Sequence, residues 1–515
     1  MKSIIKLNVQ YVTEVIGEEY KKWNKGDIIK IKTQTGSGKS YFIKNTLIPY
    51  IDEINNLKVF SEFKVLILTN RIALSRQTKN DLLKKYNMQI PSNLKNLDDI
   101  KQIKNITLMN YQSLNEYIMN ESNFNANYYD YIICDEIQYI FEDSFTGNTE
   151  LALNELIYKS NKESIKIFMS ATMEQLDNMI NKSNCRIWEY DTNRDYSYLI
   201  PHTYNKQEQL IKQINDDKSK DKWLIFVASI QKGKDLLKEL QENNIDAVII
   251  YKGRRDKKSR EEFNNIIIKE KFNCKVLITT KLLDNGVNIM DDKVKNIVVN
   301  SWSRENLIQS IGRVRFKSLK EAYNINLYLD EKTHKQVWGK LNAIDKTLKH
   351  FELLIADKNE FNKKIRNKLN KLPNGIHLDK NNQFIFDKVT YANLLKTKIE
   401  MTNLEKDFDS ISYINKQLSW LGINHKEIIR LEEIQEKQTN DEIEEYIKSL
   451  IDKPLGKQQR EELIQMINLR DARGRQQKTL KTINAYLQEN YNMYMESKVI
   501  RFDGNIIRVW ILNNK

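Results

Sequence analysis

The chain has 515 residues, with 83 Lys and Arg against 69 Asp and Glu, which gives a formal net charge of +14 and an isoelectric point of about 9.2. A single compact core rarely holds so long a chain, so the length argues against a one-domain protein and favours three or four domains. The basic charge is compatible with a polyanionic partner, but many basic proteins never bind nucleic acid, so the charge alone does not identify one.

Cysteine and histidine spacing argues against a disulfide framework and against a structural metal. The three cysteines, Cys134, Cys185 and Cys274, lie far apart and form no C-x-x-C pair, and no two histidines have H-x-x-x-H spacing. No stretch approaches the roughly 20 apolar residues that span a bilayer, and the N-terminus lacks a long apolar core. We therefore expect a soluble, cytoplasmic protein without a membrane partner.

Between residues 27 and 310, short apolar runs rich in β-branched residues alternate with longer amphipathic stretches. Runs that are apolar on both faces are typical of parallel strands covered by helices, so we predict an α/β fold with two tandem parallel-sheet domains. The predicted strands are Asp27–Ile31, Val65–Leu68, Tyr131–Cys134, Ile165–Met169, Leu224–Val227, Ala247–Tyr251, Val276–Thr279 and Asn296–Val299. A polar segment, Asp191–Asp195 followed by Tyr196–Pro201, is a candidate interdomain linker.

Beyond about residue 331 the pattern becomes helical, as in Asp441–Ile451, whose apolar residues form one stripe. Near the end, Thr479–Gln488 predicts a helix, and Lys498–Leu512 predicts two strands around the turn Asp503-Gly504. Such a helix and hairpin suit either a winged helix or a stabilising addition. We predict domains at residues 1–195 and 196–330, and a mainly helical accessory domain with a terminal β-hairpin at 331–515.

A glycine-rich segment, Thr33–Ser40, follows the first predicted strand and precedes a helical stretch. Glycines let the backbone curl so that its N–H groups and the helix N-terminus face phosphate oxygens. In this phosphate-binding loop, Lys39 is expected to reach the β and γ phosphates of ATP, and the Ser40 hydroxyl to hold Mg²⁺. The predicted nucleotide-binding residues of the loop are Thr35, Gly36, Ser37, Gly38, Lys39 and Ser40.

Two carboxylates, Asp135 and Glu136, follow the strand Tyr131–Cys134, about a hundred residues after the loop, and Gln138 follows them. Hydrolysis of a phosphoanhydride needs one carboxylate to hold Mg²⁺ and another to orient the attacking water. We assign the first role to Asp135 and the second to Glu136. We include Gln138 with them in the predicted catalytic set.

The ordered motifs between about residues 20 and 317 resemble superfamily 2 helicases of the DExH type, in the DEAD/DEAH-box helicase family. The resemblance implies two RecA-like domains with ATP in the cleft between them. Thr69–Leu74 resembles motif Ia and Asn110–Leu114 the motif Ib region, and Ser170-Ala171-Thr172 is similar to motif III. These motifs imply that Thr69, Arg71, Gln112 and Ser113 contact the bound nucleic-acid strand. They also imply that the hydroxyls of Ser170 and Thr172 couple closure of the ATP site to the nucleic-acid face.

Three later segments, Ile225–Ser229, Thr280–Ile289 and Gln309–Arg315, resemble motifs IV, V and VI. The resemblance implies that Ser229 and Thr280 contact the nucleic-acid strand, and that the bound ATP is contacted by Asp284, Gly286, Asn288 and Gln309. Arg313 is the first choice for the arginine that reaches the γ phosphate. The family usually places its second arginine three residues later, whereas here Arg315 follows at two and Lys317 at four.

The predicted function is an ATP- and Mg²⁺-dependent helicase or translocase that moves along or unwinds nucleic acid, with DNA favoured over RNA. The alternatives are a remodelling subunit of a replication, restriction or defence complex that separates no strands itself, and a non-hydrolysing nucleic-acid-binding platform. The C-terminal domain is a candidate for protein contacts. Two sets of residues have two interpretations each. The cluster Arg470, Arg473, Arg475 and Lys478 suits either phosphate binding or a solvated helix face, and the tryptophans Trp302, Trp338 and Trp420 suit either base stacking or core packing.

Overall fold

The computed structural model of the chain describes residues 2–514, apart from residues 7–10, 35, 58–61, 71, 92–93, 121–123, 143–148, 159–162, 174–175, 178–179, 181–184, 194–195, 254–255, 281–287, 316–323, 366–371, 380, 410, 472 and 503–504. The chain forms two compact units, Met1–Ile429 and Arg430–Lys515. In the part of the chain that the structure describes, no helix is both long and apolar enough to cross a membrane.

The first unit begins with an eight-stranded sheet in the order β1-β8-β2-β7-β6-β3-β5-β4. Every neighbouring pair is parallel except β4 with β5, which is antiparallel. The strands are β1 (Lys2–Lys6), β2 (Ile28–Lys32), β3 (Val65–Thr69), β4 (Gln102–Ile103), β5 (Ile106–Asn110), β6 (Tyr131–Asp135), β7 (Ile165–Ser170) and β8 (Ile187–Asp191).

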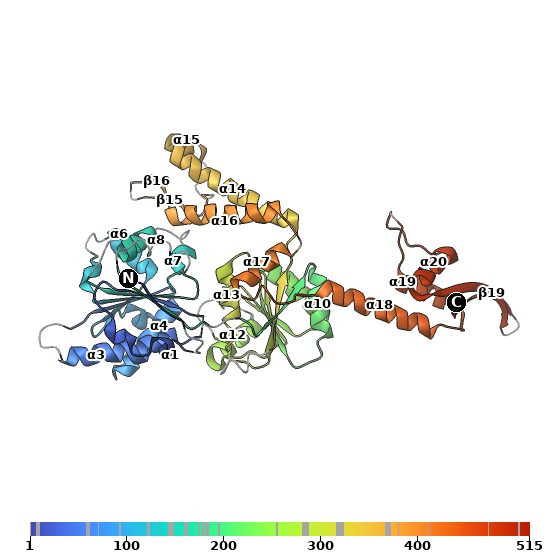
Figure 1. Cartoon of the computed structure of the whole chain (residues 1–515), viewed down its shortest axis with the longest axis horizontal. Coiled ribbons are helices and arrows are strands. Elements are labelled where there is room, and N and C mark those ends of the chain that lie inside the picture. Colours follow the sequence, from blue (N-terminus) through green and yellow to red (C-terminus); the bar gives the residue numbers. More distant parts are fainter. Residues whose placement is uncertain are drawn as a thin grey trace. The chain divides into compact units, whose positions relative to one another are not determined.

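Helices cover both faces of this sheet (Figure 1). Because successive side chains of a strand point to opposite faces, Val65 and Ile67 pack in one core while Leu66 and Leu68 pack in another. The first core contains side chains from α1 (Val12–Ile16), α2 (Lys39–Phe42), η2 (Ile43–Leu47), α3 (Ile48–Leu57) and α4 (Ile72–Lys85). The second contains side chains from α6 (Tyr111–Asn120), α7 (Tyr139–Glu142) and α8 (Thr149–Leu153). The remaining short helices are η1 (Glu19–Lys22), α5 (Leu94–Asp99), η3 (Ala126–Tyr128) and η5 (Asn154–Tyr158).

A second sheet follows, in the order β11-β12-β10-β13-β14-β9-β17. Its pairs from β11 to β9 are parallel. The strands are β9 (Leu199–Tyr204), β10 (Lys222–Phe226), β11 (Ala247–Ile250), β12 (Val276–Thr279), β13 (Val294–Val299), β14 (Ile325–Asp330) and β17 (Ile429–Arg430). The helices between them are α10 (Gln207–Asp216), α11 (Ile230–Glu242), α12 (Lys257–Lys269) and α13 (Arg304–Ile311).

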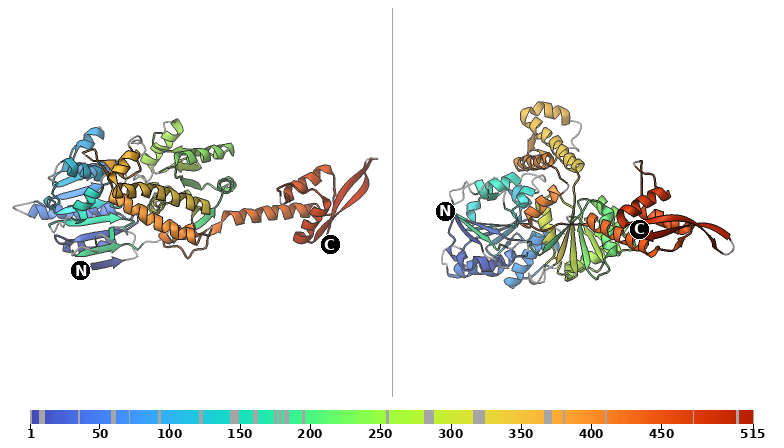
Figure 2. Two further views of the ribbon diagram at one scale, coloured as in Figure 1. Left: turned by 90° about the horizontal axis from the view of Figure 1, so that it is seen from above. Right: turned by 45° about the vertical axis from the view of Figure 1, so that its right-hand side comes forward.

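After the second sheet the chain forms a small helical layer, in which α14 and α16 lie side by side (Figures 1 and 2). Its elements are α14 (His334–Ala356), α15 (Lys358–Ile365), β15 (Ile376–Leu378), β16 (Phe384–Phe386) and α16 (Lys388–Lys406). The next helix, α17 (Ser412–Trp420), returns to the core of the second sheet through Ile414 and Leu418. Its Gln417 side chain also donates a hydrogen bond of 3.3 Å to the carbonyl of Ser301.

The described residues of the second unit form three helices and a three-stranded sheet in the order β18-β20-β19, with both neighbouring pairs antiparallel. Its elements in chain order are α18 (Leu431–Ser449), β18 (Pro454–Leu455), α19 (Lys457–Ile467), α20 (Leu480–Tyr491), β19 (Met493–Phe502) and β20 (Asn505–Asn514). Two helices joined by a turn and followed by a hairpin form the arrangement of a winged helix. The turn Asp503-Gly504 itself lies outside the described residues.

The structure confirms the predicted α/β class with two parallel-sheet domains, and each of the eight predicted strands is present within one to two residues. It corrects the proposed linker, because Leu199–Pro201 opens strand β9 rather than connecting the domains. The predicted helix and hairpin near the end are both present. The domain boundaries at residues 195 and 330 stay predictions.

Candidate functional site

The phosphate-binding loop follows β2 and ends where α2 begins at Lys39. Gly36 and Gly38 have φ angles of +88° and +81°, a region that L side chains rarely adopt, so the curl of the loop depends on glycine at both positions. The buried hydroxyl of Ser37 donates to the Gln34 carbonyl at 2.8 Å and lies 2.7 Å from the Thr33 hydroxyl. The loop is therefore held in its curved form by its own side chains, while Thr35 lies outside the described residues.

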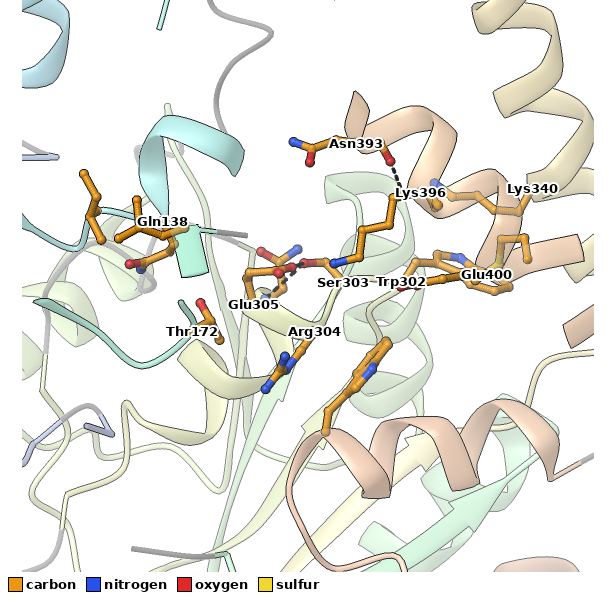
Figure 3. A pocket seen from close by; sticks show the side chains of 16 residues that line it. Gln138, Thr172, Trp302, Ser303, Arg304, Glu305, Lys340, Asn393, Lys396 and Glu400 are labelled. Atoms are coloured by element: carbon orange, nitrogen blue, oxygen red, sulfur yellow. Dashed lines mark hydrogen bonds between the residues drawn. The ribbon is translucent and has the colours of Figure 1, made fainter. Parts of the chain in front are cut away.

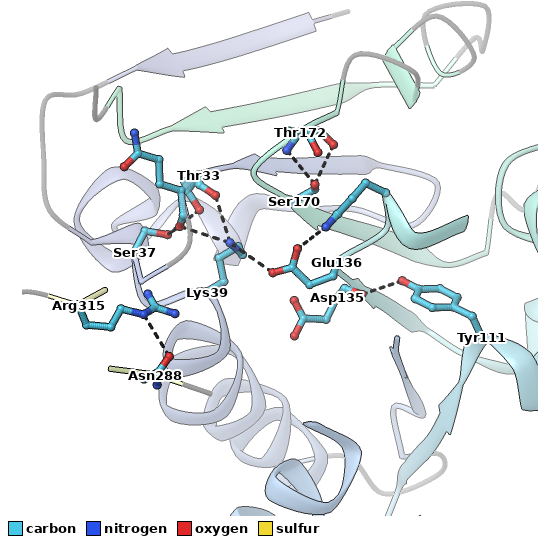
Figure 4. A network of polar contacts seen from close by, with 12 residues as sticks. Thr33, Ser37, Lys39, Tyr111, Asp135, Glu136, Ser170, Thr172, Asn288 and Arg315 are labelled. Atoms are coloured by element: carbon cyan, nitrogen blue, oxygen red, sulfur yellow. Dashed lines mark hydrogen bonds and ion pairs between the residues drawn. The ribbon is translucent and has the colours of Figure 1, made fainter. Parts of the chain in front are cut away.

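Lys39 is buried at the start of α2 and points into the curl of the loop (Figure 4). Its Nζ donates to the carbonyl of Thr33 at 3.1 Å and of Gln34 at 3.4 Å, and lies 3.9 Å from Oε1 of Glu136. These are weak, replaceable partners for an ammonium group. The lysine is thus placed where incoming phosphate oxygens would replace backbone carbonyls as its hydrogen-bond acceptors. Ser40 lies beside it in the first turn of α2 and is half-buried.

The acidic pair lies at the carboxyl end of β6. Asp135 is its last residue and is paired with Met169 of β7, and Glu136 turns out of the strand with a φ of +50°. The hydroxyl of Tyr111 donates to the Asp135 carbonyl at 3.0 Å, and Nε2 of Gln138 donates to Oε2 of Glu136 at 2.6 Å. The turn at Glu136 therefore directs the two carboxylates apart, and the hydrogen bond from Gln138 fixes the position of the Glu136 carboxylate.

Burial raises the pKa of Asp135 to about 7, with a further contribution from the charge of Glu136 and an opposing one from Lys39. A carboxylate that is this costly to ionise is stabilised by a nearby cation. Mg²⁺ prefers hard oxygen ligands, and the Asp135 carboxylate together with the Ser40 hydroxyl offers such a donor set. The residues present therefore fit a Mg²⁺ ion bound with the phosphates of ATP.

Arg315, from the second sheet's domain, lies against the phosphate loop of the first (Figure 4). A Cβ atom built on Gly36 would come within 1.8 Å of Nη1 of Arg315. Asn288 accepts a hydrogen bond of 3.1 Å from Nε of Arg315, and a parallel bridge between Ile289 and Val314 aligns the two segments. The structure thus brings together Lys39, Glu136 and Arg315, whereas Arg313 is buried beside this bridge.

Motif III forms a closed turn at the end of β7. The buried Oγ of Ser170 accepts the N–H of Thr172 at 2.9 Å and donates to its carbonyl at 2.7 Å. Thr172 and Gln138 then line one wall of a cavity of about 360 Å³ (Figure 3). Gln138 therefore contacts Glu136 of the acidic pair through its amide N–H, while its buried Oε1 has no partner among the described residues.

The opposite walls of this cavity come from the second sheet's domain and from the helical layer. Trp302 contributes from the segment before α13 and Glu305 from the first turn of that helix, and Lys340 of α14 and Lys396 of α16 complete the wall (Figure 3). Burial lowers the pKa of Lys340. The sequence prediction missed both lysines because they belong to no motif, and only the packing of α14 and α16 brings them to the wall.

The predicted strand-binding residues fall into two groups. Thr69 is buried at the end of β3, and Gln112 and Ser113 are exposed at the start of α6, where Gln112 donates to the Tyr139 hydroxyl. Ser229 and Thr280 line a second cavity, of about 410 Å³, at the carboxyl edge of the second sheet. The two cavities share four residues, namely Trp302, Ser303, Asn306 and Lys340.

Besides Thr35, three predicted site residues, Arg71, Asp284 and Gly286, lie outside the described residues. Gln309 is half-buried on α13. Of the tryptophans, Trp302 packs against Tyr413 with ring centroids 4.8 Å apart and also lines both cavities.

Comparison with known proteins assigns the two sheet domains. Residues 14–179 match the DEAD/DEAH box helicase domain, and residues 205–317 match the helicase conserved C-terminal domain, so together they cover more than half of the chain. No curated protein sequence matches the chain.

Among solved structures, S. cerevisiae Dbp5 bound to RNA and ADP BeF3 is similar over 62% of this chain and 82% of its own, at 16% identity and a TM-score of 0.41. A DEAD box protein from the hyperthermophile Methanococcus jannaschii is similar over 64% of this chain and 89% of its own, at 20% identity and a TM-score of 0.37. From the two domain matches and the two parallel sheets, the chain belongs to the DEAD/DEAH box helicases, the ATP-hydrolysing enzymes of superfamily 2.

Proposed function

We propose that this helicase couples ATP hydrolysis to movement along, or separation of, the strands of DNA, with ATP bound between its two sheet domains. The observation that carries the proposal is the contact of Arg315 with Gly36. It places a guanidinium from the second domain against the phosphate loop of the first. A site shared between two domains converts phosphate chemistry into relative domain movement, because binding and hydrolysis change what holds the domains together.

Each group around the loop has a distinct role in this proposal. Lys39 exchanges the carbonyls of Thr33 and Gln34 for phosphate oxygens, while Ser40 and Asp135 hold Mg²⁺, which neutralises phosphate charge when it is bound. Glu136 orients and deprotonates the attacking water, and the hydrogen bond from Gln138 fixes that carboxylate. These residues therefore supply the positioning and electrostatic stabilisation on which phosphoryl transfer depends.

Arg315 contributes from the opposite domain. A planar guanidinium stabilises charge that spreads over the phosphate oxygens in the transition state, and Asn288 fixes its direction through the hydrogen bond to Nε. Once phosphate leaves, the attraction across the domain boundary weakens. Hydrolysis would therefore release the second domain, and repeated cycles would shift its grip on the strand.

The link from the ATP site to the strand runs through Gln138 and Thr172. Both line the cavity whose far walls carry Lys340 and Lys396 together with Glu305 and Glu400, so a change at the acidic pair reaches a charged wall directly. Phosphate contacts dominate the affinity of proteins for nucleic acid, and binding of the nucleic-acid strand should therefore weaken steeply with salt. We propose that the strand follows this cavity and the adjoining one that contains Ser229 and Thr280.

The test is ATPase activity across a panel of single-stranded and double-stranded DNA and RNA, with Lys39→Ala as the matched inactive variant. We expect stimulation by DNA above that by RNA, and turnover lost in Lys39→Ala. Stimulation by RNA alone would overturn the DNA assignment. Nucleotide binding without turnover on every nucleic acid would instead support a non-hydrolysing platform.

A translocase that separates no strands would have the same ATP site, so a second measurement is needed. Strand displacement on tailed duplexes distinguishes the two activities, and the direction of the tail that supports displacement gives the polarity. DNA-stimulated ATPase with translocation but without displacement would identify the chain as a remodelling subunit.

A further inference from the structure

Charge in the second unit is segregated between its elements. Helix α18 carries seven carboxylates against two lysines, whereas residues 468–481, which connect α19 to α20 and begin α20, carry five cations against one carboxylate. The described cations of this connection are exposed. The unit therefore presents a basic region that attracts a polyanion and an acidic helix that repels one, which orients any such partner.

The connection between α19 and α20 is an ordered turn. The carboxylate of Asp471 accepts the N–H groups of Arg473 and Arg475 at 2.9 Å and 2.8 Å, and its second oxygen accepts Nε of Arg475 at 2.9 Å. These hydrogen bonds hold the pKa of Asp471 below its usual value. Nη1 of Arg470 donates to the carbonyl of Gly474 at 3.0 Å. The single acid of this region thus fixes the turn that displays its cations.

Helix α20 has one face in the core and one in solvent. Ile483 and Leu487 are buried with the other apolar residues of the unit. On the outer side, Lys481, Ala485 and Gln488 are exposed at spacings of four and three, which puts them on one stripe. On this stripe Lys481 offers a cation to a phosphate, the small Ala485 permits close approach of a nucleic acid, and the Gln488 amide can hydrogen-bond to a base edge.

The hairpin of β19 and β20 is joined rigidly to α20. The side-chain amide of Asn484 in α20 accepts a hydrogen bond from the N–H of Met495 at 2.7 Å and donates one to its carbonyl at 2.8 Å. This amide therefore pairs with the backbone of β19 as a residue of a neighbouring strand would. The two hydrogen bonds fix the angle between the helix and the hairpin. The two elements would therefore act as one preorganised surface.

The face of the hairpin that packs against α20 continues past the apolar core of the unit. Cross-strand pairing puts Met495 and Leu512 on one face, and both are buried in the core with α20. The pairs Val499 with Arg508 and Arg501 with Ile506 lie on this same face, because they are separated from Met495 by even numbers of residues. Val499 is 60% exposed and Ile506 is 68% exposed. The far part of the hairpin thus carries two arginines between solvent-exposed apolar side chains.

We propose that the second unit binds double-stranded DNA, with α20 in the major groove and the hairpin against the neighbouring backbone. The major groove of B-form DNA admits a helix, whereas that of an RNA duplex is too deep and narrow for side chains to read. Cations at the turn and on the hairpin would then contact phosphates on either side of the helix. This binding does not depend on the proposed ATP-driven movement, and it would anchor the motor on the duplex.

The experiment measures the affinity of the full chain for short blunt duplex DNA at several salt concentrations without nucleotide. The variant Lys478→Ala/Lys481→Ala removes two exposed cations at the start of α20, and Lys437→Ala/Lys448→Ala removes two exposed lysines of α18 as a matched control. Each lost phosphate contact lowers the slope of log affinity against log salt by about 0.9. We expect the α20 variant to lose a slope of about 1.8, and the control to keep the wild-type slope.

A second variant, Arg501→Ala/Arg508→Ala, tests the hairpin separately, and circular dichroism checks that each variant is folded. We expect the slope of log affinity against log salt to fall by a similar amount in this variant, about 1.8. Duplex RNA and single-stranded DNA should compete for the wild-type chain more weakly than duplex DNA does. Equal losses in the α18 control, or equal competition by duplex RNA, would overturn the proposal. ATPase stimulation by single-stranded DNA, measured on the same proteins, should be unchanged in both variants, so a failed motor and a failed duplex-binding unit give different results.

Discussion

Replacing Arg315 by alanine removes the side chain of the second domain whose guanidinium lies against Gly36 of the phosphate loop. A positioned arginine contributes about 10³- to 10⁵-fold to kcat in phosphoryl transfer, which corresponds to about 4–7 kcal/mol of transition-state stabilisation. We expect Arg315→Ala to lower the nucleic-acid-stimulated kcat by a factor in this range. ATP affinity should change little, because the guanidinium acts mainly on charge that develops during transfer.

The assay is steady-state ATP hydrolysis with saturating DNA, together with nucleotide binding. Asn288→Ala removes the partner of Arg315 Nε, held at 3.1 Å, and should cost about tenfold, as expected for one hydrogen bond to a charged group. Arg260→Ala, at an exposed position on α12, is the matched control and should be silent. The reasoning is refuted if Arg315→Ala keeps more than about a tenth of wild-type kcat while Arg313→Ala loses it, because the buried arginine would then be the one that reaches the phosphate.

Three further substitutions test other parts of the molecule. Glu136→Gln should bind ATP but hydrolyse it at least about 10²-fold more slowly, as single-turnover kinetics would show, because the base for the attacking water is lost. Ser170→Ala removes the hydroxyl that closes the turn with Thr172, so strand displacement should fall more than ATP hydrolysis when both are measured together. Glu189→Ala leaves the fully buried ammonium of Lys30 with fewer acidic partners and should destabilise the first domain by about 3 kcal/mol in chemical denaturation.

Each of these has its own contrary result. An unchanged single-turnover rate in Glu136→Gln would remove that residue from catalysis, and equal loss of both activities in Ser170→Ala would assign the turn to hydrolysis alone. For Glu189→Ala the control is Glu163→Ala, which breaks an exposed ion pair of 3.3 Å with Lys25 and should cost under about 1 kcal/mol. Equal unfolding free energies in these two variants would show that the buried charge is compensated by its remaining partner.

The local chemistry of the ATP site could be predicted from the sequence because it depends on short-range order. A strand, two glycines with Lys39 and a following helix specify the loop, and the structure gives both glycines the positive φ that this geometry needs. The strand before Asp135 and Glu136 is likewise a local pattern, and its burial raises the pKa of Asp135. Short runs that are apolar on both faces indicated the parallel strands for the same reason.

Long-range contacts could not be predicted in this way. The sequence favoured Arg313 for the phosphate, but which of the two arginines faces Gly36 depends on the bridge between Ile289 and Val314, far apart in the chain. The return of α17 to the second sheet's core was also missed, since its apolar stripe does not say which partner it meets.

The sequence by itself determined the two parallel-sheet domains, the phosphate loop with Lys39 and the acidic pair, because each is encoded by neighbouring residues whose backbone preferences and side-chain chemistry act locally. Only the tertiary structure decided that Arg315 lies at Gly36, and that Lys340 and Lys396 line a cavity with Gln138. The physical reason is that these contacts join segments whose approach is fixed by packing of whole elements, and periodicity shows which face of an element is buried without showing against what.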